Sequence, residues 1–105
     1  MLDIKELKKN YTTTQDIKQK VEIGIQICAY YHKANNFKET LKYNLQILPY
    51  AEKLTDKASW YLIIVNIGNS YSSNGEYEKA HDYYEKLLQT AEFESNEAWL
   101  ARAYY

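Results

Sequence analysis

Residues 60–71 read WYLIIVNIGNSY, and residues 77–91 read YEKAHDYYEKLLQTA. In both stretches apolar and small residues recur three and four positions apart, which is the spacing of one helix face. Asn74-Gly75 lies between them and is a strong turn signal. The apolar run at 60–65 could by itself be a buried strand, but its continuation at helical spacing argues against that reading. The two stretches therefore predict two helices joined by a tight turn.

The same pattern occurs once more, 40 residues earlier in the chain. Within residues 21–52, seven residues are identical to the residue 40 positions later, and most of them are apolar or aromatic. The pairs are Ile23/Ile63, Ile27/Ile67, Tyr31/Tyr71, Tyr43/Tyr83, Leu48/Leu88, Ala51/Ala91 and Glu52/Glu92. This agreement exceeds chance pairing, so we conclude that the chain contains an internal repeat.

The sequence predicts an all-α protein. Only 3 glycines and 1 proline are available as punctuation, which favours long helices over a many-stranded β fold. Helices are expected near residues 2–10, 16–33, 37–54, 57–73, 77–92 and 96–105. Asn36, with Glu39 three residues later, is expected to cap the third of these. Pro49 lies inside that helix and cannot donate to the carbonyl of Leu45, so we expect a kink or a helix end there.

The second unit resembles the tetratricopeptide repeat. In that family the first helix of a pair carries W-x2-L-G-x2-Y and the second carries A-x3-F. Here the corresponding residues are Ile64-x2-Ile67-Gly68-x2-Tyr71, then Ala80 and Tyr84. The first unit is similar to a degraded copy, with Ile27-Cys28-x2-Tyr31 followed by Phe37, Thr40 and Asn44.

The resemblance implies a right-handed superhelix of antiparallel helix pairs, forming a single tetratricopeptide-like domain. Its parts would be an N-terminal helical segment (1–19), a first repeat (20–56), a second repeat (57–95) and the first helix of an incomplete third repeat (96–105). The 40-residue period exceeds the usual ~34 residues and is similar to that of bacterial peptide-sensing regulators and signalling proteins. Stacked pairs normally need three or more repeats, so we expect this chain to be a piece of a longer protein.

The family lines a concave groove with the first helix of each pair, which implies where a peptide would bind. Asn66 and Asn69 lie three residues apart on one helix face. A carboxamide offers one acceptor and two donors to an extended peptide backbone, although both residues could simply be polar groups on a solvated face. The residues implied to contact a peptide are Gln26, His32, Lys33, Asn66, Asn69, Ser73 and Arg102. Ile25 and Val65 stand where lysines would be needed, so capture of an acidic C-terminus is not expected.

The leading interpretation is a protein- or peptide-binding scaffold, acting as the sensory or regulatory part of a bacterial signalling or transcription-regulating protein. The alternative is a self-association module. Its motivation is the segment 96–105, where Trp99, Leu100, Tyr104 and Tyr105 would form an exposed apolar patch. A homodimer through this C-terminal helix would cover the patch.

Charge and composition argue against other partners. With 13 basic and 14 acidic residues, the formal net charge of −1 provides no footprint for nucleic acid, and no apolar run is long enough to span a membrane. The five lysines between Lys5 and Lys20 are expected on a solvated helix face. The opening residues lack the apolar core of a signal peptide, and the single cysteine fits a reducing compartment, so we expect a cytoplasmic location.

No residue pattern indicates catalysis. Cys28 aligns with Gly68, where two helices approach most closely, and is expected to be a small buried packing residue rather than a nucleophile. His32 and His81 have no metal-ligand spacing. Because the sequence also shows no phosphate-binding glycine loop and no acid pair in an apolar pocket, we expect no enzyme activity, metal or cofactor.

Overall fold

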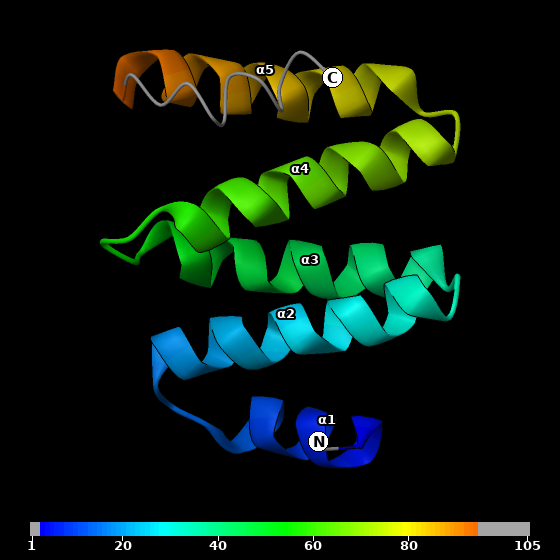
Figure 1. Cartoon of the computed structure of the whole chain (residues 1–105), viewed down its shortest axis with the longest axis vertical. Helices are drawn as coiled ribbons and strands as arrows, with labels where there is room; N and C mark the ends of the chain where they lie inside the picture. Colours follow the sequence, from blue (N-terminus) through cyan, green and yellow to red (C-terminus); the bar gives the residue numbers. More distant parts are fainter. Residues whose placement is uncertain (1–2, 95–105) are drawn as a thin grey trace. The chain divides into compact units, whose positions relative to one another are not determined.

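The computed structural model describes residues 3–94, which form five α-helices and contain no strand (Figure 1). The helices are α1 (Ile4–Thr13), α2 (Ile17–Lys33), α3 (Phe37–Glu52), α4 (Ala58–Ser73) and α5 (Tyr77–Glu94). The expected all-helical fold is confirmed for these residues. Its right-handed superhelical stacking remains a prediction, and the expected helix at 96–105 lies outside the described residues.

The chain divides into two compact units, residues 1–60 and 61–105. The division falls just after the start of α4, near the predicted end of the first repeat at residue 56. The first unit contains α1, α2 and α3, and the second contains most of α4 and all of α5.

Capping side chains set where the first three helices begin. The carboxylate of Asp3 accepts the backbone N–H of Glu6 at 2.9 Å, and Asp16 does the same for Gln19 at 3.0 Å. Asn36 accepts the N–H of Glu39 at 3.2 Å, so the cap expected there is confirmed. The reciprocal half of a capping box does not form, because the N–H of Asn36 donates to the carbonyl of Tyr31. Each cap satisfies a donor that the helix itself leaves unpaired.

Two helix ends differ from expectation. Helix α1 extends to Thr13 rather than ending near residue 10, and the hydroxyl groups of Thr12 and Thr13 donate to the carbonyls of Lys8 and Lys9. Helix α3 passes through Pro49 and ends at Glu52, so a helix end at the proline is wrong. Pro49 is exposed, and the carbonyl that loses its donor can turn towards water on that side of the helix.

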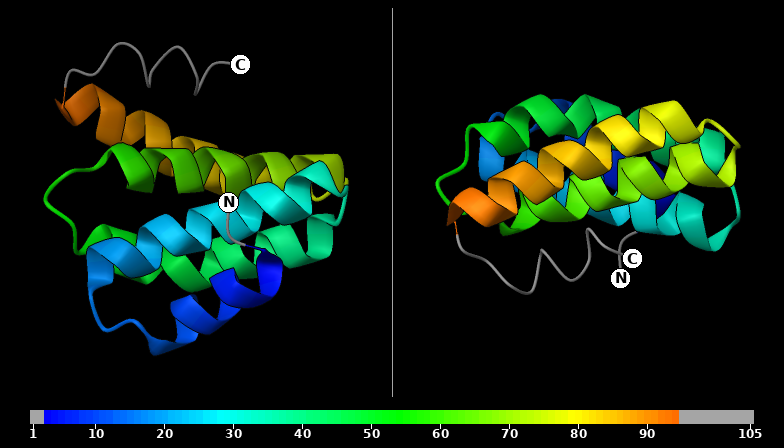
Figure 2. Two further views of the ribbon diagram at one scale, coloured as in Figure 1. Left: turned by 60° about the horizontal axis from the view of Figure 1, so that its bottom comes forward. Right: turned by 90° about the horizontal axis from the view of Figure 1, so that it is seen from above.

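Within the first unit, α2 packs antiparallel to α3 and also contacts α1 (Figures 1 and 2). The three helices meet at Gly24. A Cβ atom built on this glycine would lie 2.4 Å from Cγ2 of Ile47 on α3 and 3.3 Å from the ring of Tyr11 on α1. Ile47 is completely buried. The glycine therefore permits a close approach that a larger residue would prevent.

The second unit has a comparable close approach between α4 and α5. A Cβ atom built on Gly68 would lie 2.6 Å from Cε1 of Tyr84. Buried side chains around it are Ile64 and Ile67 on α4 and Ala80 and Leu87 on α5. Three of them, Ile64, Ile67 and Ala80, are residues on which the tetratricopeptide resemblance rests.

The internal repeat is visible as a repeated ring contact. Tyr31 and Tyr43 stack with ring centroids 5.9 Å apart and planes 14° apart. Their equivalents Tyr71 and Tyr83 stack at 5.8 Å and 26°. The 40-residue period therefore describes equivalent packing positions and not only similar letters.

The repeat also extends into α1, which the sequence comparison did not include. Leu7 lies 40 residues before Ile47, which lies 40 residues before Leu87, and all three are buried in a second-helix position. In the 40-residue register, helix α1 therefore corresponds to the second half of α3.

The turn within each helix pair needs one residue with positive φ. Asn35 fills this position in the first unit at 60°, and Gly75 fills it in the second at 79°. We expect Gly75→Ala to lower the free energy of unfolding by about 1–2 kcal/mol, because an alanine Cβ is strained in left-handed backbone. Gly75→Asn is the matched control. It should cost much less, since Asn35 already occupies the equivalent turn, and equal losses in urea denaturation would contradict this explanation.

Candidate functional site

One side of α2 is exposed between Glu22 and Lys33. Its exposed residues lie on adjoining rows of the helix and are Glu22, Gln26, Ala29, Tyr30 and Lys33. We call this set the α2 stripe. The opposite side of the helix is buried and contains Val21, Gly24, Ile27 and Cys28. Of the predicted contact residues, Gln26 and Lys33 thus lie together on one exposed face, seven residues apart.

His32 is exposed but lies beside the stripe rather than on it. Its ring packs edge-to-face on Phe37, at the start of α3, with centroids 6.0 Å apart and planes 74° apart. The predicted contact residue therefore lies in the last turn of α2 and packs against the start of α3.

The corresponding side of α4 carries the remaining described candidates. Asn66, Asn69 and Ser73 occupy the positions that Gln26, Ala29 and Lys33 occupy in α2, and we call this set the α4 stripe. Asn66 is half-buried, whereas Asn69 and Ser73 are exposed.

Asn69 is not wholly available to a ligand. Its Oδ1 accepts a short hydrogen bond from the hydroxyl of Tyr84 on α5. Sequence reasoning placed Asn69 with Asn66 by their spacing but could not foresee this contact, because Tyr84 was identified only as a packing residue. The amide N–H groups of Asn69 remain able to donate. Arg102, the last predicted contact residue, lies outside the described residues.

Lys8 and Lys20 belong to the five lysines expected on a solvated helix face, but their ammonium groups lie over tyrosine rings. Lys8 Nζ is 5.1 Å from the ring centroid of Tyr31 and 5.9 Å from that of Tyr43. A hydrogen bond with Tyr31 raises the pKa of Lys8. The stacked rings of the first unit are thus capped by a cation from α1, a favourable arrangement.

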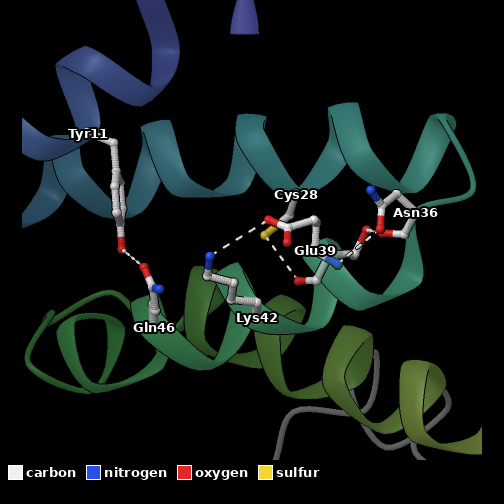
Figure 3. Close-up of polar contacts among 7 residues, drawn as sticks. Tyr11, Cys28, Asn36, Glu39, Lys42 and Gln46 are labelled. Carbon is white, nitrogen blue, oxygen red and sulfur yellow. Dashed lines mark hydrogen bonds and ion pairs between the residues drawn. The ribbon is translucent and has the colours of Figure 1, made fainter. Parts of the chain in front are cut away.

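Lys20 makes a similar connection at the start of α2. Its Nζ lies 4.3 Å from the ring centroid of Tyr11 and 5.4 Å from that of Tyr50, and it donates to the carbonyl of Tyr11 at 3.0 Å. Tyr11 itself donates to Oε1 of Gln46 at 3.4 Å (Figure 3). These contacts connect α1, α2 and α3, which indicates a structural role for these lysines and tyrosines.

Cys28 lies on the buried side of α2, as expected of a packing residue. Only 4 % of its surface is exposed, and its thiol points towards the carbonyl of Thr40 at 3.7 Å (Figure 3). Burial raises the pKa of Cys28 to about 12. The thiolate is the reactive form of cysteine, so this side chain is chemically inert at neutral pH.

One helical turn after Thr40, α3 carries a second buried polar side chain. Asn44 is 1 % exposed, and neither polar atom of its amide has a hydrogen-bond partner among the described residues. Sequence reasoning treated Asn44 only as a degraded motif position. The equivalent residue in the second unit is Tyr84, so the two helix pairs carry different side chains at the same position of the repeat.

Within residues 3–94, no group of three or more His, Cys, Asp or Glu residues is arranged to hold a metal ion. No helix in the described part of the chain has the length and apolar character needed to cross a membrane. No family model, curated protein or solved structure matches the chain.

Proposed function

We propose that this chain is a tetratricopeptide-like module that binds an extended peptide or protein segment on the exposed side of α2, with a second surface of the same kind on the exposed side of α4. It would serve as the regulatory part of a larger cytoplasmic signalling protein. The observation that carries the proposal is the repetition of the stripe. Helices α2 and α4 each bury one side. On the other side Gln26 and Lys33 of α2 are exposed, and the residues at the equivalent positions of α4 are the half-buried Asn66 and the exposed Ser73.

The side chains on the stripes are suited to peptide recognition. The amides of Gln26 and Asn66 can each pair with a backbone N–H and a backbone C=O of an extended ligand. Tyr30, 49 % exposed, offers a large apolar surface with a polar tip, the combination enriched at binding hot spots. Lys33 adds a charge at the end of the α2 stripe. Binding would order the peptide by amide contacts and exclude water with the tyrosine ring.

The test is a peptide-array screen followed by affinity measurement on each hit. We expect Gln26→Ala or Asn66→Ala to weaken binding by about tenfold, corresponding to about 1.4 kcal/mol for lost hydrogen bonds. Asn69→Ala should also weaken binding. Because that change removes the contact with Tyr84 as well, Tyr84→Phe is the matched control.

Tyr84→Phe deletes the hydroxyl that holds Asn69 but leaves every stripe residue in place. It should retain binding, and a loss equal to that of Asn69→Ala would assign the effect to packing between α4 and α5. A screen whose hits all bind the Gln26→Ala and Asn66→Ala variants as tightly as the original chain would contradict the proposal.

A further inference from the structure

The outer side of α3 carries a basic face. Lys38 and Lys42 lie one helical turn apart and are both exposed, next to Phe37, which is 45 % exposed. Lys42 is 3.9 Å from the carboxylate of Glu39, but its side chain remains 55 % exposed (Figure 3). Ion pairs of this kind contribute little in water, so the charge of Lys42 remains available to a partner.

The equivalent positions of α5 carry the opposite charge. Forty residues after Phe37, Lys38 and Lys42 stand Tyr77, Glu78 and Asp82. All three are exposed, and Tyr77 is the most exposed large hydrophobic residue among the core and surface residues described, at 69 %. Each face thus consists of one exposed aromatic residue and two like charges in the same register, basic on α3 and acidic on α5.

Local helix energetics explain Glu78 but not Lys38. Both lie in the first turn of their helix, where the macrodipole stabilises a negative charge and disfavours a positive one. Among the carboxylates of residues 3–90, none lies within ion-pairing distance of Lys38. A lysine that slightly destabilises its own helix, beside an exposed phenylalanine, points to a contact outside the folded chain.

The charges are also separated between the two units. Residues 1–60 contain ten lysines and seven acidic residues, whereas residues 61–105 contain three basic and seven acidic residues. The formal net charge of the whole chain is only −1. Copies of such a chain do not repel one another strongly, and the basic unit of one copy attracts the acidic unit of another.

We propose that this protein self-associates by docking the basic face of α3, formed by Phe37, Lys38 and Lys42, on the acidic face of α5 of a second copy, formed by Tyr77, Glu78 and Asp82. The opposite charges steer the two copies and fix the register of the helices, while the aromatic residues become buried between them. The surface differs from the α2 and α4 stripes, so a peptide could bind to the assembled form.

Sedimentation equilibrium of the whole chain tests this docking. Association is expected at about 0.1 M salt and should weaken towards about 1 M salt, because the Debye length falls from about 10 Å to about 3 Å. The double variants Lys38→Glu/Lys42→Glu and Glu78→Lys/Asp82→Lys place like charges on both faces. Each alone should associate at least about tenfold more weakly than the original chain.

Mixing the two double variants provides the decisive arm. One then has only acidic faces and the other only basic faces, so each should bind the other and restore association to within about threefold. Lys5→Glu/Lys9→Glu is the matched control, since it reverses two exposed charges at the same spacing on α1. It should associate as the original chain does. Circular dichroism checks that every variant keeps its helices.

Three results would overturn the docking. The original chain could remain monomeric at low salt up to millimolar concentration. Both double variants could associate as strongly as the original chain, or their mixture could fail to associate while each remains helical. None of these results affects peptide binding by the stripes, which is measured separately with Gln26→Ala and Asn66→Ala.

Discussion

Gly24→Ala is expected to destabilise the first unit, although alanine is the better helix former. The new methyl group would lie 2.4 Å from Cγ2 of Ile47 and 3.3 Å from Cδ1 of the same side chain. Ile47 is fully buried and branched at Cβ, so it has little freedom to move away. Overpacking of about 1–3 kcal/mol should outweigh the helix-propensity gain of about 1 kcal/mol. Urea denaturation measures the net loss.

A double-mutant cycle identifies the cause of that loss. Ile47→Ala alone should cost about 2–5 kcal/mol, because it removes buried methyl groups and leaves a cavity. Adding Gly24→Ala to Ile47→Ala should then be neutral or stabilising, since the methyl group enters the emptied space. Ala29→Gly, on the exposed side of the same helix, measures helix propensity without packing. If Gly24→Ala were equally harmful in both backgrounds, the clash with Ile47 would not be its cause.

The local elements were predictable because each rests on residues close together in sequence. The helix pair 58–73 and 77–94 follows from apolar spacing around Asn74-Gly75, and the cap at the start of α3 follows from Asn36 and Glu39. The buried role of Cys28 followed from its alignment with Gly68. These features need only one helix or one repeat comparison.

The contacts that sequence reasoning missed join side chains from different helices. The sequence predicts Lys8 to be a surface lysine, whereas in the structure α1 places its ammonium group over the rings of Tyr31 and Tyr43. Asn69 reads as a free amide until Tyr84 reaches it from α5. In both cases the helical spacing gives the face but not the partner. The partner depends on how the next helix packs, which periodicity alone does not determine.

The basic face of α3 and the acidic face of α5 also needed the structure in addition to the sequence pattern. Lys38 and Glu78 occupy equivalent places in the sequence repeat, but comparing the repeats for identities hides positions where charge is reversed. The charge reversal is informative because Lys38 and Glu78 are both exposed, where a partner can reach them. Buried residues at these positions would be explained by packing within the chain. Searching a repeat for systematic differences is therefore as useful as searching it for agreement.

Gly68→Ala should destabilise the second unit by a clash with the Tyr84 ring, which supplies the three nearest atoms. The added methyl group would meet the Tyr84 ring at 2.6 Å from Cε1, 2.9 Å from Cδ1 and 3.0 Å from Cζ. Moving the ring away would also break its hydrogen bond to Asn69. We expect a net loss of up to about 2 kcal/mol in the free energy of unfolding, after the gain in helix propensity. Chemical denaturation followed by circular dichroism measures it.

The sign of this effect should reverse when the ring is removed. A Tyr84→Ala background removes the three atoms nearest to the new methyl group, so Gly68→Ala should stabilise there by up to about 1 kcal/mol through helix propensity. Tyr84→Phe separates the hydrogen bond from the ring, and Gly68→Ala should remain destabilising there. A stabilising Gly68→Ala in the original chain would mean that the ring moves aside freely. The close approach of α4 and α5 at this glycine would then not be what holds the pair together.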